Sequence, residues 1–231
     1  NATNLLATSE YAKESTRSKS ELTINPDGSR KVGTDGLSKA YITEYSYGIS
    51  ESLNLFVPRL FGGSNNEPIA KDSEAVKKMQ RMFGISSTEA QQFTGQLMYW
   101  SDQSYVAAPA YLGAVVVFLF VLGLFLVKGR LKKWVVIGGV LVLLLSWGKN
   151  FSFLTDLFID FMPLYNKFRA VSSIQVIIEL VVPILAVFGL YRFLNNYEQK
   201  EEKLKALKYT IGITGGLAIA FYLLKGSLFD F

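Results

Sequence analysis

Hydrophobic and polar positions are segregated along this chain of 231 residues. Residues 1–106 mix charged, polar and apolar side chains, with 11 Lys or Arg and 12 Asp or Glu, which is typical of a region in water. Residues 107–231 instead hold long apolar runs separated by short polar segments. We therefore predict two regions, a water-exposed region over 1–106 and a membrane region over 107–231.

Four apolar runs in the second region predict transmembrane helices, because roughly 20 helical residues cross a hydrocarbon core of ~30 Å. The second run is short, but Trp134 and Trp147 bracket it as aromatic residues do at a membrane interface. The predicted fold class is a mainly α polytopic membrane protein, with four transmembrane helices after a mixed α/β extracytoplasmic region. The predicted spans are residues 107–127, 131–147, 171–194 and 207–224.

The cations of the connecting segments predict the orientation of these spans. Residues 128–133 hold four Lys or Arg and residues 192–208 hold five, whereas the segment 148–170 between them holds three. Because cytoplasmic loops carry the excess of cations, the first two segments are predicted to be cytoplasmic. The segment 148–170 and the water-exposed region then share the outer side. Since nothing before Asn1 directs export, we expect the chain to be an internal part of a longer protein, with parts missing upstream and downstream.

The composition narrows the possible chemistry. With no cysteine and no histidine, the chain cannot use thiol nucleophiles, disulfides, zinc thiolate sites or imidazole acid–base pairs. Carboxylates, amines and hydroxyls remain available. The net charge of +5 is modest and resides largely in short membrane-flanking segments, so no nucleic-acid partner is predicted.

The water-exposed region is predicted to combine a hairpin with helices. Asn25-Pro26-Asp27-Gly28 lies between short alternating segments and predicts a β-hairpin over residues 21–32. Ser86, followed three residues later by Glu89, is a capping box that opens a helix. The other predicted elements are a helix over 37–47, an ordered loop over 54–63, and helices over 73–83 and 87–100.

The segment 148–170 carries unusual chemistry for an outer membrane surface, where few cations are expected. It contains Lys149, Lys167 and Arg169, with a short amphipathic helix predicted over 153–161 at the interface. Two interpretations stay open. The cations either anchor helix ends among lipid headgroups or bind an anion.

Two sets of carboxylates are weaker candidates. Asp156 and Asp160 lie one turn apart on the interfacial helix, where they either hold a metal or simply form its polar face. Glu179 falls ~12 Å into the third span, where an ionised side chain costs on the order of 3 kcal/mol. It shares a helix face with Gln175, so we expect this polar stripe to face a cavity or another helix. Structural hydrogen bonding and a functional contact are both open for it.

Three separated motifs resemble the YfhO family of bacterial polytopic membrane proteins, in the form found in Bacteroidota. They are Tyr45-Ser-Tyr-Gly48 with Asn54-Leu-Phe-Val-Pro-Arg-Leu-Phe-Gly-Gly63, then Tyr99-Trp-Ser-Asp-Gln103, then Ser146-Trp-Gly-Lys-Asn150 with Pro163-Leu-Tyr-Asn-Lys-Phe-Arg169. Together they cover most of the chain in the order that the family has. The chain departs from the family pattern at Ser101, Ser104 and Ala108, where glycine, proline and glycine are expected.

The resemblance implies a glycosyltransferase of the GT-C type in the bacterial cytoplasmic membrane. Such enzymes take a sugar from a polyprenyl-phosphate carrier at the outer face and modify cell-envelope glycans or glycolipids. The resemblance places the catalytic carboxylate in an external loop upstream of Asn1, so no catalytic residue is expected here. No definite cofactor is implied, although some GT-C relatives use a divalent cation.

In this interpretation, the chain forms a wall that holds the lipid phosphate, because cations can stabilise the negative charge left on the departing phosphate. The alternative is a membrane protein that is no enzyme, either a transporter or an envelope scaffold. The expected partners are membrane lipids and a polyprenyl-phosphate-linked sugar. The candidate binding residues are Lys149, Asn150, Asn166, Lys167, Arg169 and Arg59, and the supporting residues are Asp102, Glu179, Gln175, Trp147 and Tyr165.

Overall fold

A computed structural model describes residues 2–15, 17–18, 24, 26–30 and 36–228. The chain divides into two compact units that interleave along the sequence. Unit 1 comprises Asn1–Ser52, Phe61–Ala108 and Leu144–Ile174, and unit 2 comprises Leu53–Leu60, Pro109–Leu143 and Gln175–Phe231. The segment after the second apolar run therefore folds with the polar residues of the first half of the chain.

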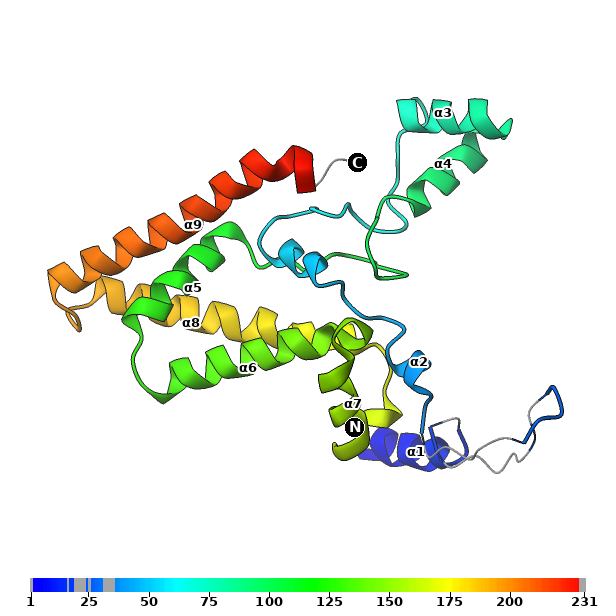
Figure 1. Ribbon diagram of the computed structural model, residues 1–231, viewed down its shortest axis with the longest axis horizontal. Helices are drawn as coiled ribbons and strands as arrows, with labels where there is room; N and C mark the ends of the chain where they lie inside the picture. The colour runs from blue at the N-terminus through cyan, green and yellow to red at the C-terminus, as the bar shows by residue number, and fades with distance from the viewer. Residues whose placement is uncertain (1, 16, 19–23, 25, 31–35, 229–231) are drawn as a thin grey trace. The chain divides into compact units, whose positions relative to one another are not determined.

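Unit 1 consists of short helices and turns (Figure 1). The described part holds two isolated antiparallel bridges, Ile24 with Arg30 and Gly62 with Tyr99, rather than a sheet, so the expected mixed α/β region is not supported. Its helices are α1 (Ala2–Lys13), α2 (Lys39–Ile42), α3 (Glu74–Phe83), α4 (Ser87–Gln96) and α7 (Ser152–Phe161), with the 3-10 turns η1 (Ser50–Leu55, ending in unit 2), η2 (Gly148–Phe151), η3 (Tyr165–Lys167) and η4 (Val171–Gln175, ending in unit 2).

The predicted hairpin is described only around its turn. Gly28 has a positive φ of 82°, and the Asp27 carboxylate accepts hydrogen bonds from the Ser29 N–H and hydroxyl. The bridge between Ile24 and Arg30 closes this turn. Residues 21–23, 25 and 31–32 of the hairpin lie outside the described residues.

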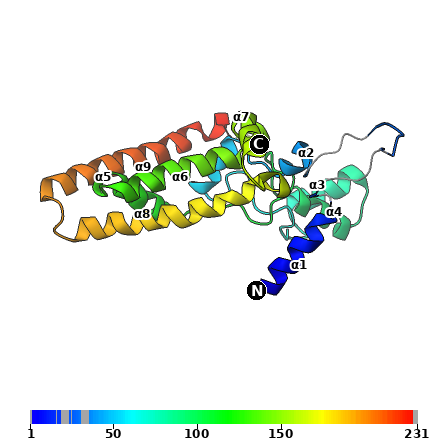
Figure 2. The same ribbon diagram turned by 90° about the horizontal axis from the view of Figure 1, so that it is seen from below.

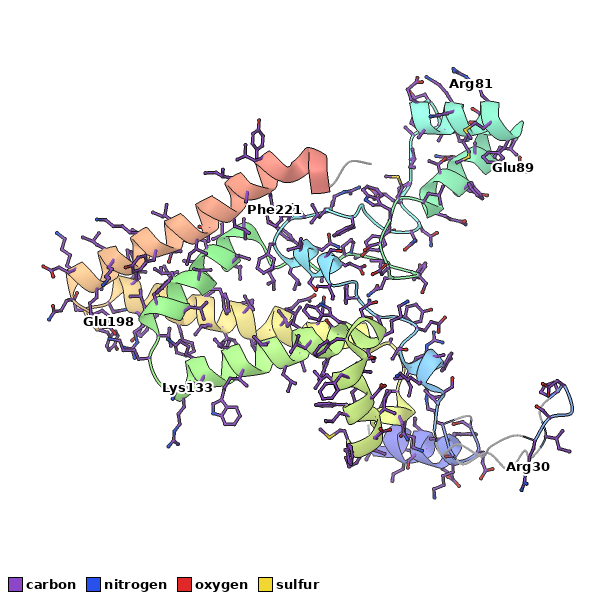
Figure 3. All side chains as sticks on the ribbon, in the orientation of Figure 1. Arg30, Arg81, Glu89, Lys133, Glu198 and Phe221 are labelled. Carbon is purple, nitrogen blue, oxygen red and sulfur yellow. The ribbon has the colours of Figure 1, made fainter. Side chains whose placement is uncertain are left out.

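The capped helices α3 and α4 agree with the sequence. Gly84 ends α3 in the left-handed conformation with a φ of 64°, which glycine adopts without a Cβ clash. Ser86 and Glu89 form the predicted capping box at the start of α4, and Figure 3 labels Glu89 there. The helix ends at Gln96, four residues before the predicted end.

Unit 2 is a group of four aligned helices, as Figures 1 and 2 show. They are α5 (Ala114–Leu126), α6 (Arg130–Ser146, whose last turn belongs to unit 1), α8 (Val176–Leu194) and α9 (Lys200–Leu228). Helices α5 and α8 cross closely, because a Cβ built at Gly189 would lie 2.6 Å from the Cα of Gly123. Glu198 links the turn between α5 and α6 to the end of α8. Its carboxylate accepts hydrogen bonds from Lys128 at 2.9 Å and from Arg192 at 3.3 Å.

Two helices are long and apolar enough to cross a membrane, Val171–Leu194 and Lys200–Leu223, so this is a membrane protein by length and composition. The run at 131–147 forms α6, after which the chain bends by 112° into Gly148–Phe161. The predicted span 107–127 is wrong in extent, since its helix α5 has 13 residues and begins after Gly113, whose φ is 92°. Four transmembrane helices are therefore not shown.

Candidate functional site

Two of the separated motifs contact each other in unit 1. The Tyr47 N–H donates to the Ser146 carbonyl at 3.0 Å, and the Lys149 N–H donates to the Ser46 Oγ at 3.1 Å. The Asn150 side-chain amide donates to the Tyr47 carbonyl at 2.8 Å. These bonds join residues 46–47 to residues 146–150, about 100 positions later in the sequence. We call these two segments the loop pair. Asn150 therefore positions backbone, while the Lys149 side chain stays exposed.

The turn at Gly148 fixes this loop pair. Gly148 has a φ of 45°, and a Cβ built on it would overlap the Ser46 side chain and Val171. The Gly148 carbonyl accepts the Thr155 hydroxyl at 2.9 Å, and the Trp147 indole N–H donates to the Ser52 hydroxyl at 2.7 Å. Glycine is therefore the residue that this close approach requires.

The third motif joins the same loop through a pair of carboxylates. The Gly48 N–H donates to the Glu51 Oε2 at 2.7 Å, and the Asp102 Oδ2 lies 2.6 Å from a Cβ built at Gly48. Burial raises the pKa of Glu51 to about 7 against the opposing hydrogen bond from Gly48, and the negative charge of Asp102 adds to the rise. Hydrogen bonds from Ser101 and Gln103 lower it in part.

Glu51 is the functional candidate that the sequence did not reveal. Its side chain has no exposed surface. Its partners include Ser101, Asp102 and Gln103, about 50 positions away along the chain, so no local pattern distinguishes Glu51 from the exposed acids. Because its pKa lies near neutral, this carboxyl can exchange a proton within the physiological range.

Arg169 lies against two tyrosines of the segment 41–48. Its Nη1 donates to the Tyr41 hydroxyl at 2.6 Å, and its guanidinium lies 4.9 Å and 5.2 Å from the ring centroids of Tyr41 and Tyr45. The nearest acid is Glu44, at 3.9 Å from the same nitrogen. The side chain is still 39% exposed. Arg169 and Lys149 are thus two exposed cations held on one short segment.

Two residues shortly before Arg169, Tyr165 and Asn166, contact other segments of unit 1. The Asn166 carbonyl accepts the Leu37 N–H at 3.0 Å, and the Tyr165 ring packs edge-on against Phe158 at 5.6 Å. Burial raises the pKa of the Tyr165 phenol. Lys167 is half-buried, unlike Lys149. The described geometry therefore gives Asn166 and Tyr165 packing and positioning contacts.

From the sequence, Asp102 either orients Lys167 or Arg169 by a charge-assisted bond or forms part of a helix-flanking turn. In the structure Asp102 lies beside Gly48, and Arg169 has Glu44 as an acidic neighbour. Residues 99–103 pack on the loop after position 47 rather than on the tyrosines before it.

The two predicted metal candidates, Asp156 and Asp160, differ in their surroundings. Asp156 of α7 accepts a hydrogen bond from the Lys39 ammonium at 2.7 Å, and Asp160 is exposed. Among the described residues, no group of three or more acids is placed to hold a metal ion. An ion pair with Lys39 accounts for the position of Asp156 without a metal.

Three predicted residues belong to unit 2, where each is described by itself. Arg59 is exposed with a φ of 58°, and Gln175 is buried. Glu179 is exposed on α8, and the expectation that it faces a cavity or another helix stays a prediction. Of the α8 residues, Ile178 and Val182 line the apolar groove of unit 2.

Comparisons of the chain with protein families, curated proteins and solved structures find no match. The arrangement itself offers two chemical capacities. The exposed guanidinium of Arg169 over the Tyr41 and Tyr45 rings can attract a phosphate, and the buried Glu51 carboxyl beside Asp102 can bind or release a proton.

Proposed function

We propose that this chain is part of a YfhO-like glycosyltransferase of the GT-C type in a bacterial cytoplasmic membrane. The enzyme takes a sugar from a polyprenyl-phosphate carrier and modifies envelope glycans or glycolipids. One observation carries the proposal. The motif segments 45–48, 99–103 and 146–150, which lie up to about 100 residues apart, contact one another in unit 1. The exposed cations Lys149 and Arg169 are held there against the segment 41–48.

In the proposed role, Lys149 and Arg169 hold the carrier phosphate. Transfer of the sugar leaves negative charge on the phosphate, and cations near a membrane surface stabilise that charge more than water does. Arg169 is favoured for this task because its rigid fork is already oriented by Tyr41. The residue that deprotonates the acceptor is proposed to lie outside this chain, as the family resemblance implies.

Phosphate binding is tested with the full chain in lipid nanodiscs and polyprenyl phosphate as the ligand. Arg169→Ala is expected to weaken binding about tenfold, because a charge-assisted hydrogen bond contributes roughly 1.5–3 kcal/mol. Arg81→Ala, an exposed arginine of α3 in the same unit (Figure 3), is the matched control and should bind as the wild type does. Equal affinity of the two variants contradicts the proposed site.

Transfer is tested with the longer protein that the proposal implies. Supplied with radiolabelled polyprenyl-phosphate sugars and membrane acceptors, it should move label to an envelope glycan or glycolipid. Absence of transfer with every sugar supplied refutes the enzymatic assignment, whatever the binding measurements give.

One observation favours transport as the second candidate function. Glu179 is an exposed carboxylate on a helix of membrane-spanning length, and such residues often mark an ion or substrate path. In a transporter, Glu179→Gln stops uptake, whereas replacing Lys149 or Arg169 of unit 1 leaves uptake unchanged. In the glycosyltransferase, Glu179→Gln leaves the affinity for polyprenyl phosphate unchanged.

A further inference from the structure

Unit 2 contains a groove whose lining is entirely hydrocarbon or glycine. The groove has a volume of about 320 Å³ and runs between α5, α6 and α8. Its walls include Phe120 and Leu124 of α5, Val136 and Gly139 of α6, and Val182 of α8. Water finds no polar partners there, so an apolar occupant fits the groove better than water does.

Glycines of unit 2 lie both at a tight helix contact and along this open groove. Gly123 and Gly189 let α5 and α8 approach so closely that a Cβ at Gly189 would meet the partner backbone at 2.6 Å. In contrast, a Cβ built at Gly139 meets no atom within 4 Å. The missing side chain of Gly139 thus makes room that no described residue fills.

The length of the groove fits one acyl chain. On α6 its lining runs from Val135 to Leu143, which is about 12 Å at 1.5 Å per residue. One leaflet contributes about half of the ~30 Å hydrocarbon core, or about 15 Å. A phospholipid acyl chain matches this span, whereas a polyprenyl chain extends well beyond it.

Cations lie at the end of the groove nearest the turn between α5 and α6. Lys132 is three residues before Val135 and therefore shares its helix face, and its ammonium donates to the Leu124 carbonyl at 3.0 Å. Lys133 is exposed, and Figure 3 shows it at the start of α6 pointing away from the helices of unit 2. The neighbouring Trp134 is 74% exposed, as expected at a headgroup level.

We propose that the groove between α5, α6 and α8 binds one acyl chain of an anionic phospholipid, whose phosphate lies at Lys132 and Lys133. The hydrocarbon lining takes the chain, and the cationic turn complements the charge of the headgroup. This site does not depend on the proposed glycosyl transfer, because all its residues belong to unit 2.

Photocrosslinking tests the acyl-chain site. The full chain is reconstituted in phosphatidylcholine vesicles that contain phosphatidylglycerol with a diazirine in one acyl chain, and labelled peptides are located by mass spectrometry. Wild type is expected to be labelled on α5 and α6 at the groove. Gly139→Leu fills the groove and should lose that labelling.

Gly138→Leu is the matched control. Gly138 is the neighbouring glycine of α6, a Cβ there also meets no atom within 4 Å, and it does not line the groove. It should keep the wild-type labelling. Equal labelling of both variants, or equal loss from both, overturns the proposal, as does wild type that is unlabelled at the groove.

The headgroup is tested separately. Lys133→Gln should reduce labelling by the phosphatidylglycerol probe, whereas Lys208→Gln, an exposed lysine of α9, should not. Displacement of the probe by an equimolar amount of polyprenyl phosphate would assign the groove to the carrier and overturn the phospholipid. Crosslinks between two copies through α6 would assign it to a second chain and also overturn it.

Discussion

The Glu51 carboxyl accepts a hydrogen bond from the Gly48 N–H and interacts with residues 101–103. The pKa of Glu51 is raised from 4.5 to about 7 by burial, so the folded state prefers the protonated carboxyl. Its contribution to stability is complete below pH 4.5 and is lost as the pH rises through 7. The full difference is about 3 kcal/mol, from 1.36 kcal/mol per pKa unit.

We therefore predict that Glu51→Gln flattens the pH dependence of unfolding. Wild type in detergent micelles should lose stability between about pH 4.5 and pH 7, while the neutral amide of the variant cannot ionise. Thermal unfolding across that range measures the effect. Glu74→Gln, at an exposed site of α3, should retain the wild-type slope. A slope that Glu51→Gln leaves unaltered contradicts the assigned cause.

Gly148 supports a second prediction about a single residue. Gly148→Ala combines a positive φ with overlap on Ser46, so it is expected to destabilise unit 1 by about 2–4 kcal/mol. Gly84→Ala has a positive φ of 64° in open space and isolates the backbone strain, which costs about 1 kcal/mol. Denaturant unfolding of both variants gives the difference, and equal losses would refute the overlap.

The functional residues were predictable only in part, for a physical reason. Lys149 and Arg169 stood out because cations are unusual beside apolar runs on the predicted outer side. Tyr41 and Glu51 gave no such signal, since the role of each comes from a partner distant in sequence. A cation beside an apolar run can be recognised in a sequence. Burial by segments that are distant in the sequence cannot.

At the scale of elements, the contact between α5 and α8 depends on two glycines. We predict that Gly189→Leu separates these helices and costs about 1–3 kcal/mol through overpacking. Gly215→Leu places the same side chain on α9, where a Cβ meets no atom within 4 Å. Unfolding in mixed micelles compares them. Loss of stability in both variants alike would indicate a general effect of leucine.

Elements defined by local signals were predictable, and those overridden by distant partners were not. The capping box of α4 acts within four residues and formed as expected. The helix predicted over 37–47 shrank to Lys39–Ile42, because the Tyr45 carbonyl accepts from Ser172 and the Tyr47 N–H donates to Ser146. Those backbone groups are committed to other segments and cannot continue the helix.

The helix predicted to begin at residue 107 shows a similar effect. The Leu112 N–H donates to the Leu55 carbonyl, and the Ala114 N–H donates to the Tyr111 hydroxyl. The apolar composition of residues 107–113 indicated a span, but these residues form no helix, and α5 begins after Gly113. Hydropathy alone does not reveal such partners.

For the whole molecule, the number of crossings determines which surfaces share a compartment. The chain has no cysteine, so single cysteines can be labelled without background. If α5 and α6 both cross, Lys78→Cys and Lys133→Cys lie on opposite sides. We expect a membrane-impermeant maleimide to label Lys78→Cys in intact cells and Lys133→Cys only after permeabilisation.

Gln199→Cys serves as the reference for that experiment. It lies between the two helices of spanning length, so it is opposite Lys78 with either two or four crossings. Labelling of Lys133→Cys together with Lys78→Cys would show that only α8 and α9 cross. In that case the four spans predicted from the sequence are wrong.

The shortness of α5 and α6 also bears on the bilayer around them. Their 13 and 17 residues extend about 20 Å and 26 Å, less than a hydrocarbon core of ~30 Å. If both cross, lipids beside them must be compressed, at a cost of fractions of a kcal/mol for each ångström of mismatch. Thicker membranes then disfavour the protein, so bilayer thickness becomes a means of sorting it among membrane regions.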